Sequence, residues 1–102
     1  MPPAPDRRVI QRPQPGWWMV KLVRRGPFVP ARIWLDGDAL RAEVIDEPID
    51  PLEIWHRRGV AITESEFRFR VEEILWFREH RPNHPACHPR QAVDLLNLEW
   101  KP

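Results

Sequence analysis

The sequence predicts an α+β fold in which an antiparallel sheet of three strands packs against one long helix and one short helix. Two observations carry this prediction. Apolar residues recur at every second position in segments between residues 17 and 45, which is the period of a strand. Helix start signals and a proline stop then enclose residues 64–81. The chain has 102 residues, 42% of them hydrophobic, so we expect one domain spanning residues 17–102. Its sheet could curl in the manner of an SH3-like barrel.

Residues 1–16, MPPAPDRRVIQRPQPG, hold five prolines and are predicted to form an N-terminal arm. Proline has no backbone N–H, so this stretch can neither continue a helix nor donate regularly to a sheet. The arm has no apolar segment typical of a secretory signal, and no stretch of the chain approaches the roughly 20 apolar residues that span a bilayer. Cys87 is the only cysteine, so no internal disulfide can form. We therefore expect a cytoplasmic protein without a membrane association.

The three strands are expected to form a meander with one apolar face. They are WWMVKLV (17–23), FVPARIWL (28–35) and ALRAEVI (39–45). The turns RRGP (24–27) and DGD (36–38) join them. Pro30 cannot donate to a strand ladder, which predicts an unpaired stretch or a bulge in the second strand.

Two helices follow. In DPLEIWHRRG the N-cap is Asp50, Pro51 takes the first helical position, and Gly59 ends the helix. Thr63 caps the long helix with Glu66 as its capping-box partner, and Pro82 stops it after residue 81. The apolar residues of this helix cover more than one side, so a second element or a partner is expected to cover the rest. The C-terminal AVDLLNLEW (92–100) is the natural candidate.

The stretch HRPNHPACHP (80–89) brings four candidate zinc ligands within reach of one another, His80, His84, Cys87 and His88. Zinc prefers four such ligands, but Pro82 interrupts the helix between the first two, and the paired C-x2-C spacing of zinc knuckles is absent. A Cys87/His88 nucleophile pair would need a base and an orienting group that sequence adjacency does not supply. We therefore favour a proline-stiffened loop whose imidazoles bond backbone groups, with no metal and no cofactor.

Other catalytic signatures are missing from the sequence. It contains no Gly-rich phosphate loop, no G-x-S-x-G elbow and no H-E-x-x-H motif. The prediction is therefore a protein that is not an enzyme.

Charge is unevenly distributed along the chain. Residues 1–32 hold seven basic residues and one acidic residue, whereas residues 33–79 hold twelve acidic and six basic residues. A basic first third could attract an anionic partner while the acidic middle repels it. The alternative is that the basic residues share no common face.

Three motifs resemble a group of small uncharacterised proteins encoded by tailed phages and prophages. They are PGWWMVKLVRRGPFVPARIW (15–34), ITESEFRF (62–69) and HRPNHPACHPRQAVDL (80–95). The resemblance implies a setting, namely an accessory gene product that acts inside a bacterial host cell. Proteins in that setting commonly bind a host factor or handle nucleic acid. Since the group has no settled activity, the resemblance implies no functional residues.

The predicted function is that of a non-catalytic protein that binds a host protein or nucleoprotein complex, for example as an inhibitor of host defence. Six tryptophans occur in a chain with no tyrosine, and Trp and Arg dominate binding hot spots. The expected partner-binding residues are Trp17, Arg24, Arg25, Phe28, Arg32 and Trp34. The alternative is a nucleic-acid-binding module with tryptophan stacking on bases and arginine contacts to phosphate. Its phosphate-binding residues would be Arg7, Arg8, Arg12, Arg24 and Arg25.

Overall fold

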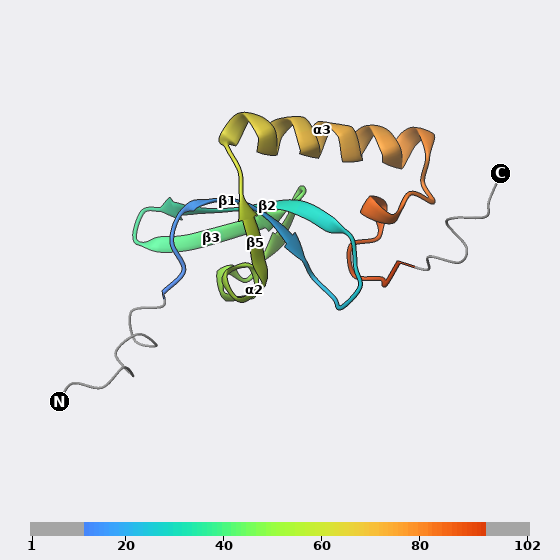
Figure 1. Cartoon of the computed structure of the whole chain (residues 1–102). Helices are drawn as coiled ribbons and strands as arrows, with labels where there is room; N and C mark the ends of the chain where they lie inside the picture. The colour runs from blue at the N-terminus through green and yellow to red at the C-terminus, as the bar shows by residue number, and fades with distance from the viewer. Residues whose placement is uncertain (1–11, 94–102) are drawn as a thin grey trace.

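The computed structural model describes residues 12–93 and contains a single antiparallel sheet with two helices (Figure 1). The strands are β1 (Gly16–Lys21), β2 (Phe28–Asp36), β3 (Ala39–Val44), β4 (Glu47–Ile49) and β5 (Arg58–Ala61). The helices are α2 (Pro51–Arg57) and α3 (Glu64–His80), and a short 3-10 turn, η1 (Pro85–Cys87), follows α3. The predicted α+β class is confirmed. Among residues 12–93, no helix is long and apolar enough to span a membrane.

The prediction of three strands is wrong, because the sheet formed within residues 12–93 has five strands in the order β4-β3-β2-β1-β5. The two additional strands give little sequence signal. β4 is three residues long and contains Pro48, and all four residues of β5 are exposed, so no apolar alternation marks either one. β5 also occupies residues 58–61, which include Gly59, the predicted end of the short helix. Both strands exist because they pair with neighbours that the sequence does predict.

The helices cover opposite faces of the sheet, with α3 on one side and α2 on the other (Figure 1). On the α2 side the apolar face of the meander packs against Ile54 and Trp55. Trp18 meets Trp55 edge-on, with ring centroids 5.7 Å apart. Val20, Val29, Ala31 and Ile33 are at most 2% exposed. This face forms most of the core.

The other face of the sheet, which carries Trp17, Arg32 and Trp34, lies on the side of α3. Phe67 and Ile74 of α3 are 7% and 4% exposed, and they share this side with the buried Pro30 and Ile45. The long helix therefore packs against the face that the sequence assigned to a partner, because the short helix already covers the apolar face.

The predicted N-caps of both helices are confirmed, because hydrogen bonds between a side chain and the nearby backbone determine where each helix begins. Asp50 accepts a hydrogen bond from the Leu52 N–H at 2.9 Å at the start of α2, with Pro51 in its first turn. The Thr63 hydroxyl accepts one from the Glu66 N–H at 3.1 Å at the start of α3. The Pro30 expectation is partly met, since the β2–β3 ladder starts only at Ala31 and the Pro30 carbonyl accepts from the Ile45 N–H at 2.9 Å.

Candidate functional site

The most exposed aromatic surface of the described chain lies on the side of α3 that faces away from the sheet. Phe69 is 64% exposed and Trp76 is 48% exposed. They are seven residues apart, about two helical turns, so they lie on one face, and His80 continues that face by one further turn. We call Phe69, Trp76 and His80 the α3 outer face. Its apolar area is not needed to dock the helix, because Phe67 and Ile74 do so from the opposite side.

Ring stacking holds the Trp76 indole in place. The His80 imidazole stacks on it with centroids 4.2 Å apart and planes 11° apart, and the His80 Nδ1 atom lies 3.0 Å from the Trp76 carbonyl oxygen. Phe77 meets the indole edge-on at 5.8 Å. A ring fixed in this way loses little conformational entropy when a partner covers it.

Acidic side chains flank the α3 outer face. Glu72, Glu73 and Glu79 lie along the same helix, and none of them forms an ion pair with a residue of known position in the structure. By contrast, Glu64 and Glu66 are paired with Arg68 and Arg70 one turn further along, at 2.6 Å and 3.6 Å. The surroundings of Phe69 and Trp76 are therefore acidic, which disfavours phosphate backbones and favours a basic or apolar protein surface.

The residues predicted to bind a partner fall into two groups. The Arg32 guanidinium lies 4.2 Å from the Trp34 ring centroid and is paired with Glu43 at 3.0 Å, so its charge is already used within the sheet. Trp17 and Trp34 are half-buried. Lys21 lies over the ring of Phe28, which is 55% exposed.

The second group, Arg24 and Arg25, lies in the turn between β1 and β2. Both side chains are exposed, and the Arg25 carbonyl accepts a hydrogen bond from the Val93 N–H at 2.9 Å. Of the arm residues proposed to contact nucleic acid, Arg12 is exposed, and Arg7 and Arg8 lie outside the described residues. Most of the C-terminal segment expected to cover α3 also lies outside them.

A groove of about 250 Å³ separates the start of α3 from the sheet, with Trp17, Arg32 and Phe67 among its walls. Each carboxylate in it has an arginine partner. Glu43 pairs with Arg32, Glu64 with Arg68, and Asp46 accepts hydrogen bonds from both terminal nitrogens of Arg78 at 2.9 Å and 3.0 Å. These hydrogen bonds hold the pKa of Asp46 below its usual value. A neutral, internally paired groove serves to dock α3 rather than to bind a charged ligand.

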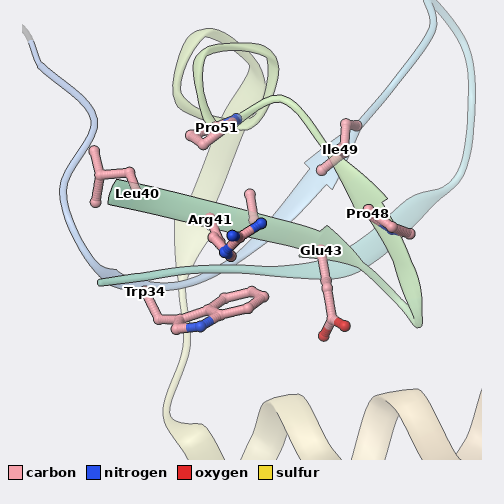
Figure 2. Close-up of a pocket in the computed structure, with 8 residues that line it drawn as sticks. Trp34, Leu40, Arg41, Glu43, Pro48, Ile49 and Pro51 are labelled. Atoms are coloured by element: carbon pink, nitrogen blue, oxygen red, sulfur yellow. The ribbon is translucent and has the colours of Figure 1, made fainter. Parts of the chain in front are cut away.

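A second hollow, of about 380 Å³, lies at the outer edge of the sheet where β4 stops short (Figure 2). Figure 2 shows Leu40, Ile49 and Pro51 on the α2 side of β3, and Trp34 with Glu43 on the side of α3. Its walls include Trp34, Leu40, Arg41, Pro48, Ile49 and Pro51. We call this hollow the β3 edge site. Of these residues only Trp34 was predicted to bind a partner, although Pro48 and Pro51, on either side of Ile49, are a signal for an early strand end.

The histidines and the cysteine of residues 80–89 are engaged in local structure. The His84 Nδ1 atom accepts a hydrogen bond from the Ala86 N–H at 3.1 Å, and its ring stacks on Phe77 at 3.9 Å. The His88 Nε2 atom lies 2.8 Å from the Pro82 carbonyl oxygen, and the Cys87 sulfur lies 3.8 Å from that of Arg81. Across residues 12–93 no cluster of three or more His, Cys, Asp or Glu side chains could hold a metal ion.

Burial lowers the pKa of His84, with a smaller contribution from Arg81 in the same direction and an opposing one from Glu73. The unfolded chain therefore takes up this proton first as the pH falls, so stability is lost below the ordinary histidine pKa of about 6.5 and down to the folded pKa. We expect the midpoint temperature of thermal unfolding to decrease as the pH is lowered from about 8 to about 5, and to decrease less in His84→Asn than in the unaltered protein. Asparagine can accept the same Ala86 N–H without titrating. Equal pH dependence in the two proteins would contradict this role of His84.

A scan against protein-family models and searches of curated proteins and of solved structures gave no match to this chain.

Proposed function

We propose that this protein is a small non-catalytic interaction module that binds another protein through the α3 outer face. The observation that carries the proposal is the exposure of Phe69 and Trp76 on a helix whose opposite side is already packed. Tryptophan is one of the residue types that most often dominate a binding interface, and here the stacked His80 ring fixes the indole of Trp76. The acidic flank formed by Glu72, Glu73 and Glu79 favours a partner surface with basic residues around an apolar centre.

The resemblance to phage and prophage accessory proteins suggests where the partner is found. A host protein or a nucleoprotein complex in the bacterial cytoplasm is the proposed target, and inhibition of a host defence component is one outcome of such binding. The proposed binding surface is therefore on α3 rather than on the sheet face predicted from the sequence, since α3 lies over the face that carries Trp17 and Arg32.

The architecture that presents α3 is proposed to be a curled, SH3-like sheet. Two features support this assignment. The first strand lies between the second and the last, and a short helix precedes the last strand. In this arrangement α3 is an addition to the sheet, attached through Ile62 after β5, and is available to carry a binding surface of its own.

The test is affinity purification of the tagged protein from a bacterial lysate, with and without nuclease. We expect a protein partner to be retained after nuclease treatment and to be lost in Phe69→Ala and Trp76→Ala. Each change should weaken binding by about 2 kcal/mol or more, roughly thirtyfold, as at other aromatic hot spots. Matched controls are Leu52→Ala and Val60→Ala, which truncate side chains that are 49% and 68% exposed elsewhere on the surface. Retention of the partner by both α3 variants would refute the proposed surface.

The same purification distinguishes the alternative function, binding of nucleic acid. Arg24 and Arg25 favour it, because both are exposed side by side in the β1–β2 turn and neither forms an ion pair with another residue that the structure places. In that case nuclease would remove the bound material, binding would weaken steeply with salt, and Arg24→Ala with Arg25→Ala would reduce it.

A further inference from the structure

The outer edge of β3 is only partly paired. β3 pairs with β2 along the whole length of β3, from Ala39↔Asp36 to Val44↔Ala31. On the other side, β4 pairs only with the last three residues of β3, from Ala42↔Ile49 to Val44↔Glu47. The first three residues of β3 therefore have a strand neighbour on one side alone within the described chain.

The sequence after Ile49 explains why β4 ends there. Continuing the observed register would place Pro51 opposite Leu40, and proline has no N–H to offer to a ladder. Asp50 instead caps α2, and Pro51 takes its first turn. The chain thus turns away from β3 at the point where Leu40 still needs a partner.

Leu40 directs its backbone N–H and C=O toward this free edge. In antiparallel pairs the residues alternate between those that bond one neighbouring strand and those that bond the other. A two-residue turn joins a pair of residues that hydrogen-bond each other, and β3 has one such turn at each end. Ala39 is paired with Asp36 of β2 and Val44 is paired with Glu47 of β4. The backbone N–H and C=O groups of odd-numbered β3 residues therefore point toward β2, and those of even-numbered residues point toward the outer edge. The bond from the Ile45 N–H to the Pro30 carbonyl of β2 agrees with this alternation.

The chemistry around the free edge defines what fits there. The β3 edge site provides about 380 Å³ beside Leu40, with the Trp34 ring, Ile49 and Pro51 among its apolar walls. Three exposed acids, Asp38, Glu47 and Asp50, lie just before β3 and at the two ends of β4, and none forms an ion pair in the described part of the chain. The basic Arg41 is already paired with Asp36 at 2.6 Å. The edge therefore carries a negative excess.

We propose that the β3 edge site binds an extended peptide of a partner protein in which basic residues flank an apolar one, added as a short strand beside Leu40. The peptide backbone bonds the outward N–H and C=O of Leu40, its apolar side chain enters the hollow beside Trp34, and its basic side chains meet Asp38 and Glu47. Strand addition of this kind takes its affinity from the main chain and its specificity from the side-chain pockets. This surface shares no residue with the α3 outer face, so a negative result for one proposal does not refute the other.

The test measures binding of a fluorescein-labelled peptide, Arg-Val-Arg-Val-Arg-Val with blocked ends, to the full-length protein by anisotropy, together with backbone amide NMR shifts. We expect binding with shifts concentrated at residues 39–42 and 49. Methylating the valine nitrogens of one probe and the arginine nitrogens of a second removes alternate peptide N–H groups, so one of the two probes should bind about fivefold or more weakly. A probe with glutamate in place of arginine should bind more weakly still.

Three protein variants test the site itself. Leu40→Pro removes the outward N–H together with a side chain that lines the hollow and packs against the core, whereas Leu40→Ala removes the side chain and keeps the N–H. Trp34→Ala removes another wall of the hollow. Leu40→Pro should weaken binding of the arginine probe more than Leu40→Ala does, and Trp34→Ala should also weaken it. Val60→Ala, on the opposite edge strand β5, should not. Absence of binding at millimolar peptide, equal affinity for the glutamate probe, equal affinity for both methylated probes, or NMR shifts confined to β5 would each overturn the proposal. Self-association of the protein that Leu40→Pro abolishes would show that a second copy occupies the edge instead, and would also overturn it.

Discussion

Replacing Phe67 with alanine is expected to lower the free energy of unfolding by about 3 kcal/mol, at the lower end of the range for a buried phenylalanine. Phe67 is 7% exposed and lies between the first turns of α3 and the sheet, where the Arg32 guanidinium is 5.9 Å from its ring centroid. Few other apolar side chains dock this half of the helix, since the remaining groove walls are largely ion pairs. The loss should therefore free the start of α3 in particular, which hydrogen exchange of its backbone amides would detect.

Phe69→Ala is the matched control, because it makes the same change in the same helix on the opposite side. Since Phe69 is 64% exposed, its loss should change stability by no more than about 0.5 kcal/mol. Chemical denaturation of the two variants measures the difference directly. Equal destabilisation would mean that α3 does not pack through Phe67 and that its outer face is not free.

Ile54→Ala is expected to have a comparable effect, about 3 kcal/mol, on the opposite face of the sheet. Ile54 is fully buried, and it joins the core formed by Val29, Ala31 and Val44 under α2. Removing a buried aliphatic side chain costs the lost burial and leaves a cavity that a small domain fills only in part. Because this face contains most of the core, unfolding should remain cooperative rather than release one element.

Leu52→Ala provides the control within α2, since Leu52 is 49% exposed and two residues away. It should change the denaturation midpoint only slightly. If Leu52→Ala destabilised the protein as much as Ile54→Ala, the orientation of α2 described above would be wrong. Together, the two pairs of variants measure separately how much the packing of α2 and the packing of α3 contribute to the free energy of unfolding.

The fold class and the helix starts were accessible from sequence because they depend on local chemistry. Asp50 and Thr63 cap their helices with the expected backbone bonds, and the alternation of Val29, Ala31 and Ile33 marks a half-buried strand. β4 and β5 were not accessible in this way. All of their residues except the half-buried Ile49 are exposed, so their positions are set by pairing with β3 and β1, which no local pattern records.

The candidate site could be predicted only in part. A surplus of aromatic side chains was evident, but the sequence did not indicate which sheet face the long helix would cover. Once α2 covers the apolar face, α3 lies over Trp17 and Arg32, and the exposed aromatic side chains of α3 are Phe69 and Trp76. The β3 edge site was missed because it results from a strand that is too short, a property of register rather than of composition.

Site-specific photo-cross-linking tests most directly whether the α3 outer face is where a protein partner binds. A photoreactive phenylalanine analogue would replace Phe69 in one protein and Val60, 68% exposed on β5, in another. We predict that the partner becomes covalently joined through position 69, in nuclease-treated lysate, and not through position 60. A partner that still co-purifies but cross-links only from position 60 would contradict the proposed binding surface.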